Sequence, residues 1–152
     1  MGISIALLTF FAVVTLVFVN QRLGQRKKAY QDSFVSLKIA LGCRHQAVRH
    51  VLEASRLYWQ KSDKARELGD ACMEAERILG YAVRSFSCDS VARLCQAESR
   101  LNLLLRGLQT ELERNQDAHR DNHLKGQLEL LDEAENDVVS LRRAYNRPWD
   151  GP

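Results

Sequence analysis

The first charged side chain of this 152-residue chain is Arg22. The run before it, from Ile3 to Val19, contains only apolar and hydroxyl side chains. A helix of that length spans roughly 25 Å, close to the thickness of the hydrocarbon core of a bilayer. This run constrains the fold more than any other part of the chain, because it has to be removed from water.

A cleaved secretory signal, a membrane anchor or a buried core helix would each remove the run from water. A signal peptide begins with basic side chains and ends with small residues at a cleavage site, and neither is present here. A core helix keeps a polar outer face, which the run lacks. The pattern therefore favours an uncleaved transmembrane anchor that consists of residues 1–21.

Basic residues follow this anchor, and none precedes it. By the positive-inside rule, the N-terminus lies outside and the C-terminal part lies in the cytoplasm. We therefore expect a single-pass protein of a bacterial cell (inner) membrane. The bilayer is its first expected partner, through a basic cluster that meets the lipid headgroups. The cluster consists of Arg22, Arg26, Lys27 and Lys28.

The composition of the remaining chain is that of one modest domain. The formal net charge is only +3, and basic residues beyond the cluster alternate with acidic ones, so no nucleic-acid interface is expected. The cysteines share no metal-site spacing and are predicted to be small buried hydrophobes. They are Cys43, Cys72, Cys88 and Cys95.

The chain after the anchor is predicted to be helical throughout. Its two prolines, Pro148 and Pro152, stand at the very end and interrupt no helix. Clusters of Ser, Asp and Asn mark the breaks, as helix N-caps do. The predicted helices run from the anchor to about residue 59, and then over 63–84, 89–114 and 122–146, with caps at Ser62 or Asp63, Ser87 or Asp89, and Asp121.

Each of these helices has an apolar seam with alternating steps of three and four residues, which places one stripe against its neighbours. Short connections make consecutive helices antiparallel. The predicted fold is all-α: an N-terminal transmembrane helix leads into an up-down four-helix bundle over residues 22–146, followed by a short tail over 147–152. The seams of the first and last helices include Phe34, Leu41, Val48, Ser55, Leu124, Leu131, Val138, Arg142 and Tyr145.

Three charged residues, Arg44, Glu98 and Glu135, occupy seam positions where the period calls for an apolar side chain. A charge buried alone is very costly, so three inward-facing charges should meet. One guanidinium has enough donors for two carboxylates. We interpret the three as a structural network that sets helix register. A ligand or ion site in the bundle interior, or a rotated seam that exposes the charges, are the alternatives.

Three segments of the chain form a pattern of their own: AESRL at 97–101, LELLDEAENDV at 128–138 and RRAYN at 142–146. These segments resemble the LemA family. The matched positions are Arg44, Glu98, Glu135, Asn136, Tyr145 and Asn146, whereas the family's Tyr-Pro-x-Leu and Asp-Val-Gln-Leu elements are missing, so this is a divergent member. The resemblance implies a membrane-anchored antiparallel helical domain with an extracytoplasmic N-terminus. It implies no reaction, because the family has no agreed biochemical activity. Roles in signalling, in antigen presentation and, for some relatives, in magnetosome membrane assembly are associated with the family.

The spacings of potential catalytic residues predict no enzyme, no cofactor and no metal site. A di-iron bundle needs Glu-x-x-His motifs, and none occurs. His119 and His123 lack the intervening glutamate of a zinc protease and straddle a predicted loop. The glycines stand singly, without a phosphate-binding loop.

The function expected from this pattern is a non-enzymatic scaffold or adaptor at the cytoplasmic membrane face, in signalling or membrane organisation. A small-ligand sensor, or an enzyme that uses the polar interior, is the alternative. Tyr58, Trp59 and Trp149 are the candidate contacts with a protein partner of unknown identity; alternatively, Tyr58 closes the core and Trp149 packs on it. The oligomeric state does not follow from the sequence.

Overall fold

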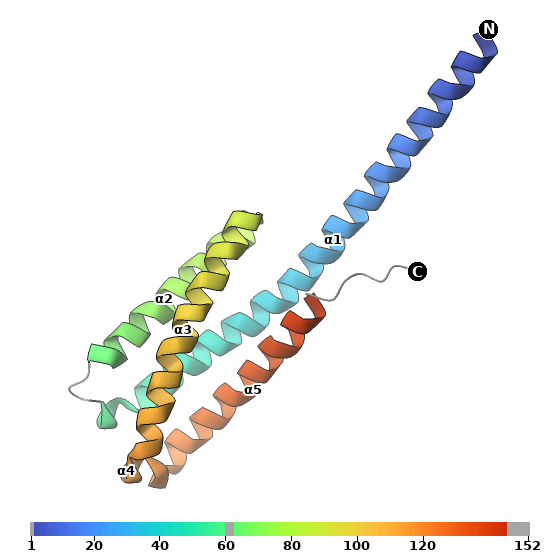
Figure 1. Cartoon of the computed structure of the whole chain (residues 1–152). Helices are drawn as coiled ribbons and strands as arrows, with labels where there is room; N and C mark the ends of the chain where they lie inside the picture. The colour runs from blue at the N-terminus through green and yellow to red at the C-terminus, as the bar shows by residue number, and fades with distance from the viewer. Residues whose placement is uncertain (1, 60–62, 146–152) are drawn as a thin grey trace.

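The computed structural model describes residues 2–59 and 63–145, with the backbone alone for 2–20, 22, 23, 26, 27 and 145. Within these ranges all regular structure is helical, so the predicted all-α class is confirmed. The elements are α1 (Gly2–Ala54), a 3-10 turn η1 (Arg56–Tyr58), α2 (Asp63–Arg84), α3 (Cys88–Arg114), α4 (Gln116–Arg120) and α5 (Asn122–Tyr145) (Figure 1).

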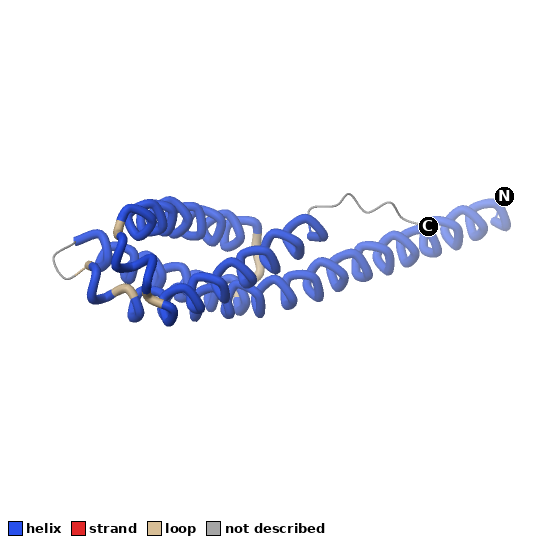
Figure 2. Tube along the Cα trace, turned by 90° about the horizontal axis from the view of Figure 1, so that it is seen from below, coloured by secondary structure: helices blue, strands red, loops and turns tan. Residues whose placement is uncertain are grey.

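Consecutive long helices run antiparallel. The helix α5 returns along the second half of α1, while α2 and α3 form a hairpin that packs beside them (Figures 1 and 2). The boundaries of α2, α3 and α5 lie within one residue of those predicted from the sequence. The short helix α4 was not predicted, and α1 ends five residues before the expected position.

The first half of α1 projects beyond the other helices (Figure 1). At 1.5 Å per residue, its 53 residues form a rod about 80 Å long. Where side chains are described, no helix combines the length and the apolarity that a bilayer crossing requires. The predicted anchor, 1–21, falls almost entirely on residues whose side chains lie outside that part of the chain.

The bundle core consists of two apolar clusters, one above the other along the helix axes. The cluster farther from the projecting half of α1, which we name the lower cluster, is built around Val51, Leu105 and Leu124, and it also contains Trp59. The second cluster, which we name the upper cluster, lies nearer the projecting half of α1 and is built around Phe34, Leu41, Leu79 and Leu94. The seam prediction is therefore correct at most positions. It is wrong at Arg142, whose side chain is exposed because α5 extends there past the closely packed part of the bundle.

Two of the predicted N-cap residues cap the helices that follow them. Ser87 caps α3 in a reciprocal arrangement: the Ser90 backbone N–H donates to Ser87 Oγ at 3.2 Å, and the Ser87 N–H donates to Ser90 Oγ at 2.9 Å. Asp121 Oδ1 accepts from the backbone N–H groups of His123 and Leu124 at the start of α5. Both arrangements satisfy donors that a helix start leaves without a partner.

The prediction that all four cysteines are buried is wrong. Only Cys72 is buried; Cys43, Cys88 and Cys95 are exposed. The three exposed residues lie outside the apolar seams, on helix faces that turn toward solvent. The composition indicated that cysteine side chains are small and apolar, but it did not indicate which of them point into the core.

Candidate functional site: a buried polar layer

A layer of polar side chains separates the two apolar clusters. On α1, Arg44 lies between Leu41 of the upper cluster and Val48 of the lower one. On α3, Glu98 lies between Leu94 and Leu101 in the same way. The layer therefore occupies a single level of the bundle. This is the level at which charged residues were predicted to interrupt the apolar seams.

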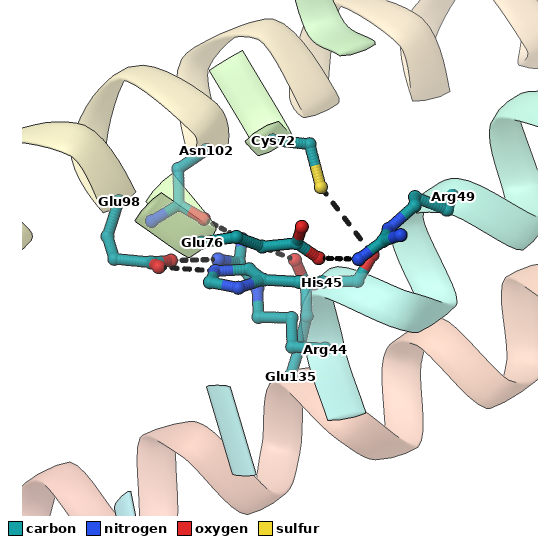
Figure 3. Close-up of polar contacts among 8 residues, drawn as sticks. All are labelled: Arg44, His45, Arg49, Cys72, Glu76, Glu98, Asn102 and Glu135. Atoms are coloured by element: carbon teal, nitrogen blue, oxygen red, sulfur yellow. Dashed lines mark hydrogen bonds and ion pairs between the residues drawn. The ribbon is translucent and has the colours of Figure 1, made fainter. Parts of the chain in front are cut away.

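Arg44 is the centre of this layer, and only 3% of its surface is exposed. Its Nη1 donates to Glu98 Oε2 at 2.6 Å, and its Nη2 donates to Glu135 Oε1 at 3.3 Å (Figure 3). Nη2 also donates to Asn102 Oδ1. One guanidinium thus joins α1, α3 and α5, and the prediction that Arg44, Glu98 and Glu135 meet is confirmed. The rotated-seam alternative is excluded for these three residues.

His45 completes the layer. Its ring is fully buried, and its Nε2 lies 2.5 Å from Glu98 Oε1, so the two oxygens of Glu98 serve one cationic and one imidazole partner. An ionised carboxylate only accepts, so Nε2 carries the hydrogen in this contact. The other ring nitrogen, Nδ1, is buried and has no hydrogen-bond partner among the described residues.

The layer is not closed equally on all sides. The Glu98 side chain is 13% exposed, whereas that of Glu135 is 32% exposed. Asn102 is exposed as well. Solvent therefore reaches the network at its α3 and α5 members, and the α1 members Arg44 and His45 are the most deeply buried.

Contacts with α2 complete the surroundings of the network. The Cys72 thiol donates to the backbone carbonyl of His45 at 3.5 Å, and burial raises its pKa to about 11. On the outer side, Arg49 of α1 forms an ion pair with Glu76 of α2 (Figure 3). The Cys72 sulfur is thus held as a neutral thiol and is a poor nucleophile.

The hydrogen bonds of the polar layer hold three helices in a fixed position relative to one another. Both Arg44 terminal nitrogens donate to fixed side chains on other helices, which sets the register of α1 against α3 and α5. Within the described residues, no group of three or more His, Cys, Asp or Glu side chains is arranged to hold a metal ion. The only unused polar atom buried in the layer, among these residues, is His45 Nδ1.

The aromatic residues expected to contact a partner lie at the distal end of the bundle, except Trp149, which lies outside the described residues. Trp59 is only 8% exposed and packs in the lower core. The Tyr58 hydroxyl donates to Asp121 Oδ2 at 3.0 Å, a hydrogen bond that raises the tyrosine pKa. This placement favours the alternative in which Tyr58 closes the core.

A different apolar side chain is available at this end. Leu57, in the turn η1, is 73% exposed. The residue that follows it, Tyr58, lines a hollow of about 420 Å³ together with Trp59 and residues of α3 and the α3–α4 junction. Of the predicted headgroup cluster, Lys28 is exposed, and the side chains of Arg22, Arg26 and Lys27 lie outside the described part.

Three residues of these sites were not identified from the sequence. His45 follows Arg44 directly, and a one-residue step of 100° placed it off the seam; no pattern indicated that α2 and α3 cover it. Asn102 likewise lies one position beyond a seam leucine. Leu57 had no signal at all, because its exposure depends on where α1 ends.

Comparison with known proteins identifies no relative: no family model, no curated protein and no solved structure matches this chain. The function is therefore inferred from the geometry of the molecule and from the motif resemblance described above.

Proposed function

We propose that the protein is a membrane-anchored, non-enzymatic scaffold or adaptor. In this proposal residues 1–21 cross the bacterial cell membrane with the N-terminus outside. The bundle is held at the cytoplasmic face, and its distal end is presented to a protein partner. The LemA resemblance supports the anchored helical domain and leaves its partner open.

The continuity of α1 is the observation that carries the proposal. One uninterrupted helix includes the apolar run at its start and Arg44 near its end. Because the Arg44 network ties this helix to α3 and α5, the bundle is joined rigidly to the predicted span. A rigid stalk positions a surface at a set distance from a bilayer, which is what an adaptor requires.

The distal surface around Leu57 is the docking site that we propose for the partner. A leucine side chain exposed over most of its area presents apolar surface at this end of the bundle, and its neighbour in the chain, Tyr58, lines a hollow of about 420 Å³. Exposed apolar side chains next to a concave surface are typical of sites that bind a partner helix or loop.

Membrane extraction and thiol labelling test the anchor. We expect the chain to stay in the membrane pellet at alkaline pH, and a variant that lacks residues 1–21 to be released. In intact cells the exposed thiols Cys88 and Cys95 should resist a membrane-impermeant maleimide and react after permeabilisation. Release of the full chain contradicts the anchor, and labelling in intact cells contradicts the orientation.

Photo-crosslinking tests the docking site. A photoreactive amino acid at position 57 should capture a specific protein in native membranes, and the same group at Leu130 of α5, which is 53% exposed, is the matched control. Leu57→Glu should abolish the function of the protein in cells, measured as rescue of a strain that lacks it, without unfolding the chain. If the photoreactive group captures the same proteins at positions 57 and 130, the distal end is not the docking surface.

A small-ligand sensor is the second candidate, and one observation favours it: His45 Nδ1 is buried without a partner, in a layer that solvent reaches at Glu135. Glu98→Gln discriminates between the two candidates. If this variant folds and loses the phenotype while Leu57→Glu retains it, the interior is the functional site and the adaptor proposal is wrong.

A further inference from the structure

Charge is distributed unevenly along the axis of the bundle. We name as the proximal end the part that is level with the upper cluster: residues 29–41 of α1, 79–94 of α2, α3 and the turn between them, and 138–145 of α5. This part has five basic and two acidic side chains, whereas the rest of the bundle, residues 42–78 and 95–137, has twelve basic and sixteen acidic ones. The positive charge of the bundle is therefore concentrated at the end from which α1 projects.

Each of the four long helices contributes to this charge, and all five basic side chains are exposed. None of the five has an ion-pair partner among the described residues. Basic residues in the last turn of a helix interact favourably with its dipole, which accounts for part of the charge on α2 and α5. It does not account for the charge on α1 or in the second turn of α3. The five residues are Lys38, Arg84, Arg93, Arg142 and Arg143.

Tyrosines accompany these charges. The two exposed tyrosines of the described part of the chain both lie at the proximal end: Tyr30 of α1 is 46% exposed and Tyr81 of α2 is 50% exposed. Basic residues and tyrosines gather where a protein surface meets lipid headgroups, because the ring enters the interface while the hydroxyl stays in water. The composition of this end is therefore that of a surface that contacts lipid.

The projecting half of α1 leads from the proximal end to the predicted span (Figure 1). Phe34 lies 13 residues after residue 21 on one uninterrupted helix, so an upright stalk holds this end about 20 Å from the hydrocarbon. The headgroup layer occupies about 6 Å of that distance. The field of an anionic leaflet extends over a Debye length of about 8 Å beyond the headgroups. The proximal end thus lies close to the edge of an attractive field.

A tilt of the stalk closes the remaining distance. Transmembrane helices tilt by about 20° on average and by up to about 40°. In the bundle, α1 packs against α2 and α5, and α3 lies diagonally opposite (Figures 1 and 2). A tilt toward α3 therefore lowers the proximal ends of α2, α3 and α5 together, and these ends have four of the five basic side chains.

We propose that the proximal end docks on anionic lipid headgroups of the cytoplasmic leaflet. The inference rests on the proposed anchor, and it adds a second membrane contact made by the bundle itself. The rest of the bundle, in which acidic residues outnumber basic ones, is repelled by the same leaflet. Attraction at one end and repulsion at the other orient the bundle, so that its distal end faces away from the membrane.

Fluorescence quenching of the full chain in lipid nanodiscs tests the contact. A fluorophore is attached at Cys88, an exposed residue of the proximal end, after Cys43 and Cys95 have been replaced by serine. A minor lipid with a spin-labelled headgroup quenches the fluorophore when the two are close. Quenching should be about twofold stronger or more with about 30% phosphatidylglycerol than with phosphatidylcholine alone. About 0.5 M NaCl, which shortens the Debye length to about 4 Å, should abolish the difference.

Neutralising the arginines of the proximal end should also abolish the difference between the two lipids. Glutamine is the replacement, because its helix propensity is close to that of arginine. The matched control removes the same number of charges from the rest of the bundle, at exposed arginines without an ion-pair partner in the described part, and should leave the difference unchanged. The proximal variant has Arg84→Gln, Arg93→Gln, Arg142→Gln and Arg143→Gln; the control has Arg56→Gln, Arg66→Gln, Arg106→Gln and Arg120→Gln.

The outcomes separate this inference from the proposed function. A chain that inserts into both nanodiscs but is quenched equally in them overturns the docking alone, and an acidic protein segment is then the occupant of the basic end. A difference that survives in the proximal variant overturns the assigned surface. If that variant does not fold, the salt dependence of the unchanged surface decides. A chain that inserts into neither nanodisc overturns the anchor and this inference with it.

Discussion

Arg44 Nη1 and Glu98 Oε2 lie 2.6 Å apart, although 54 residues separate the two in the chain. Both side chains are largely buried, with exposed fractions of 4% and 13%. A pair of this kind is costly to desolvate, and its main effect is that either charge becomes very unfavourable without the other. It therefore selects the one helix register in which α1 and α3 bring the two together.

Removing the cation tests this role. Arg44→Met should destabilise the fold by about 3–5 kcal/mol, because the Glu98 carboxylate remains buried beside His45 without its cation. Glu135→Gln should cost about 1 kcal/mol, because that side chain is 32% exposed and its contact is longer, at 3.3 Å. Thermal unfolding of the chain in detergent micelles, followed by circular dichroism, gives both values. Equal losses for the two variants would contradict a network centred on Glu98.

A ring contact attaches the α2–α3 turn to α1. The ring centroids of Phe34 and Phe86 lie 4.9 Å apart, with the planes tilted by 59°. Phe86 is partly buried, so Phe86→Ala should cost about 2 kcal/mol, less than the 3–5 kcal/mol of a fully buried ring. Amide exchange should accelerate mainly in residues 83–91. Tyr81→Ala, at a side chain that is 50% exposed, is the control and should leave exchange there unchanged.

Asp121 makes the stability of the distal end dependent on pH. Hydrogen bonds from the Leu124 backbone N–H and then from the Tyr58 hydroxyl lower the pKa of this carboxyl. A lowered pKa means that the ionised form stabilises the fold above the ordinary aspartate value of about 4, and that this contribution is lost as the pH falls through the folded-state pKa. Asp121→Asn keeps a capping side chain but no charge.

The stability difference between the wild-type chain and Asp121→Asn should therefore be largest at neutral pH and should shrink below about pH 4. Denaturant unfolding at a series of pH values measures it. Asp117→Asn is the control, because that exposed carboxylate of α4 is not the capping residue of α5. A difference that stays constant down to the most acidic pH would show that the Asp121 charge has no part in the cap.

The thiols should fall into two classes. Cys43, Cys88 and Cys95 are exposed and should react with a maleimide in the folded chain. Cys72 should react only after denaturation, because it is buried and its pKa of about 11 leaves little thiolate at neutral pH. Mass spectrometry counts the adducts: three before denaturation and four after it. A fourth rapid adduct in the folded state would mean that α2 opens at the polar layer.

Much of the fold followed from periodicity. Phe34, Leu41 and Val48 on α1, and Leu124 and Leu131 on α5, were expected in the seam and are buried. Such predictions succeed because a helix has a set rotation per residue, so that spacing along the chain becomes direction in space. The same reasoning located Arg44, Glu98 and Glu135 in the core before any contact was known.

Residues beside the seam were not predictable in this way. His45 is fully buried and Cys95 is exposed, although each lies one residue after a seam position. Which of them is covered depends on where a neighbouring helix lies: α2 packs over the His45 side of α1, and no described part of the chain covers the Cys95 side of α3. Trp59 entered the core for a related reason, since the chain turns back at the end of α1.

The sequence by itself determined the helical class, the boundaries of α2, α3 and α5 to within one residue, and the level at which charges interrupt the core, because these depend on local spacing and on the cost of burying a lone charge. Only the tertiary structure decided that Glu98 is shared between Arg44 and His45, and that Trp59 packs in the core while Leu57 is exposed. Both depend on the rotation and separation of helices distant in the chain, which packing sets and local spacing does not encode.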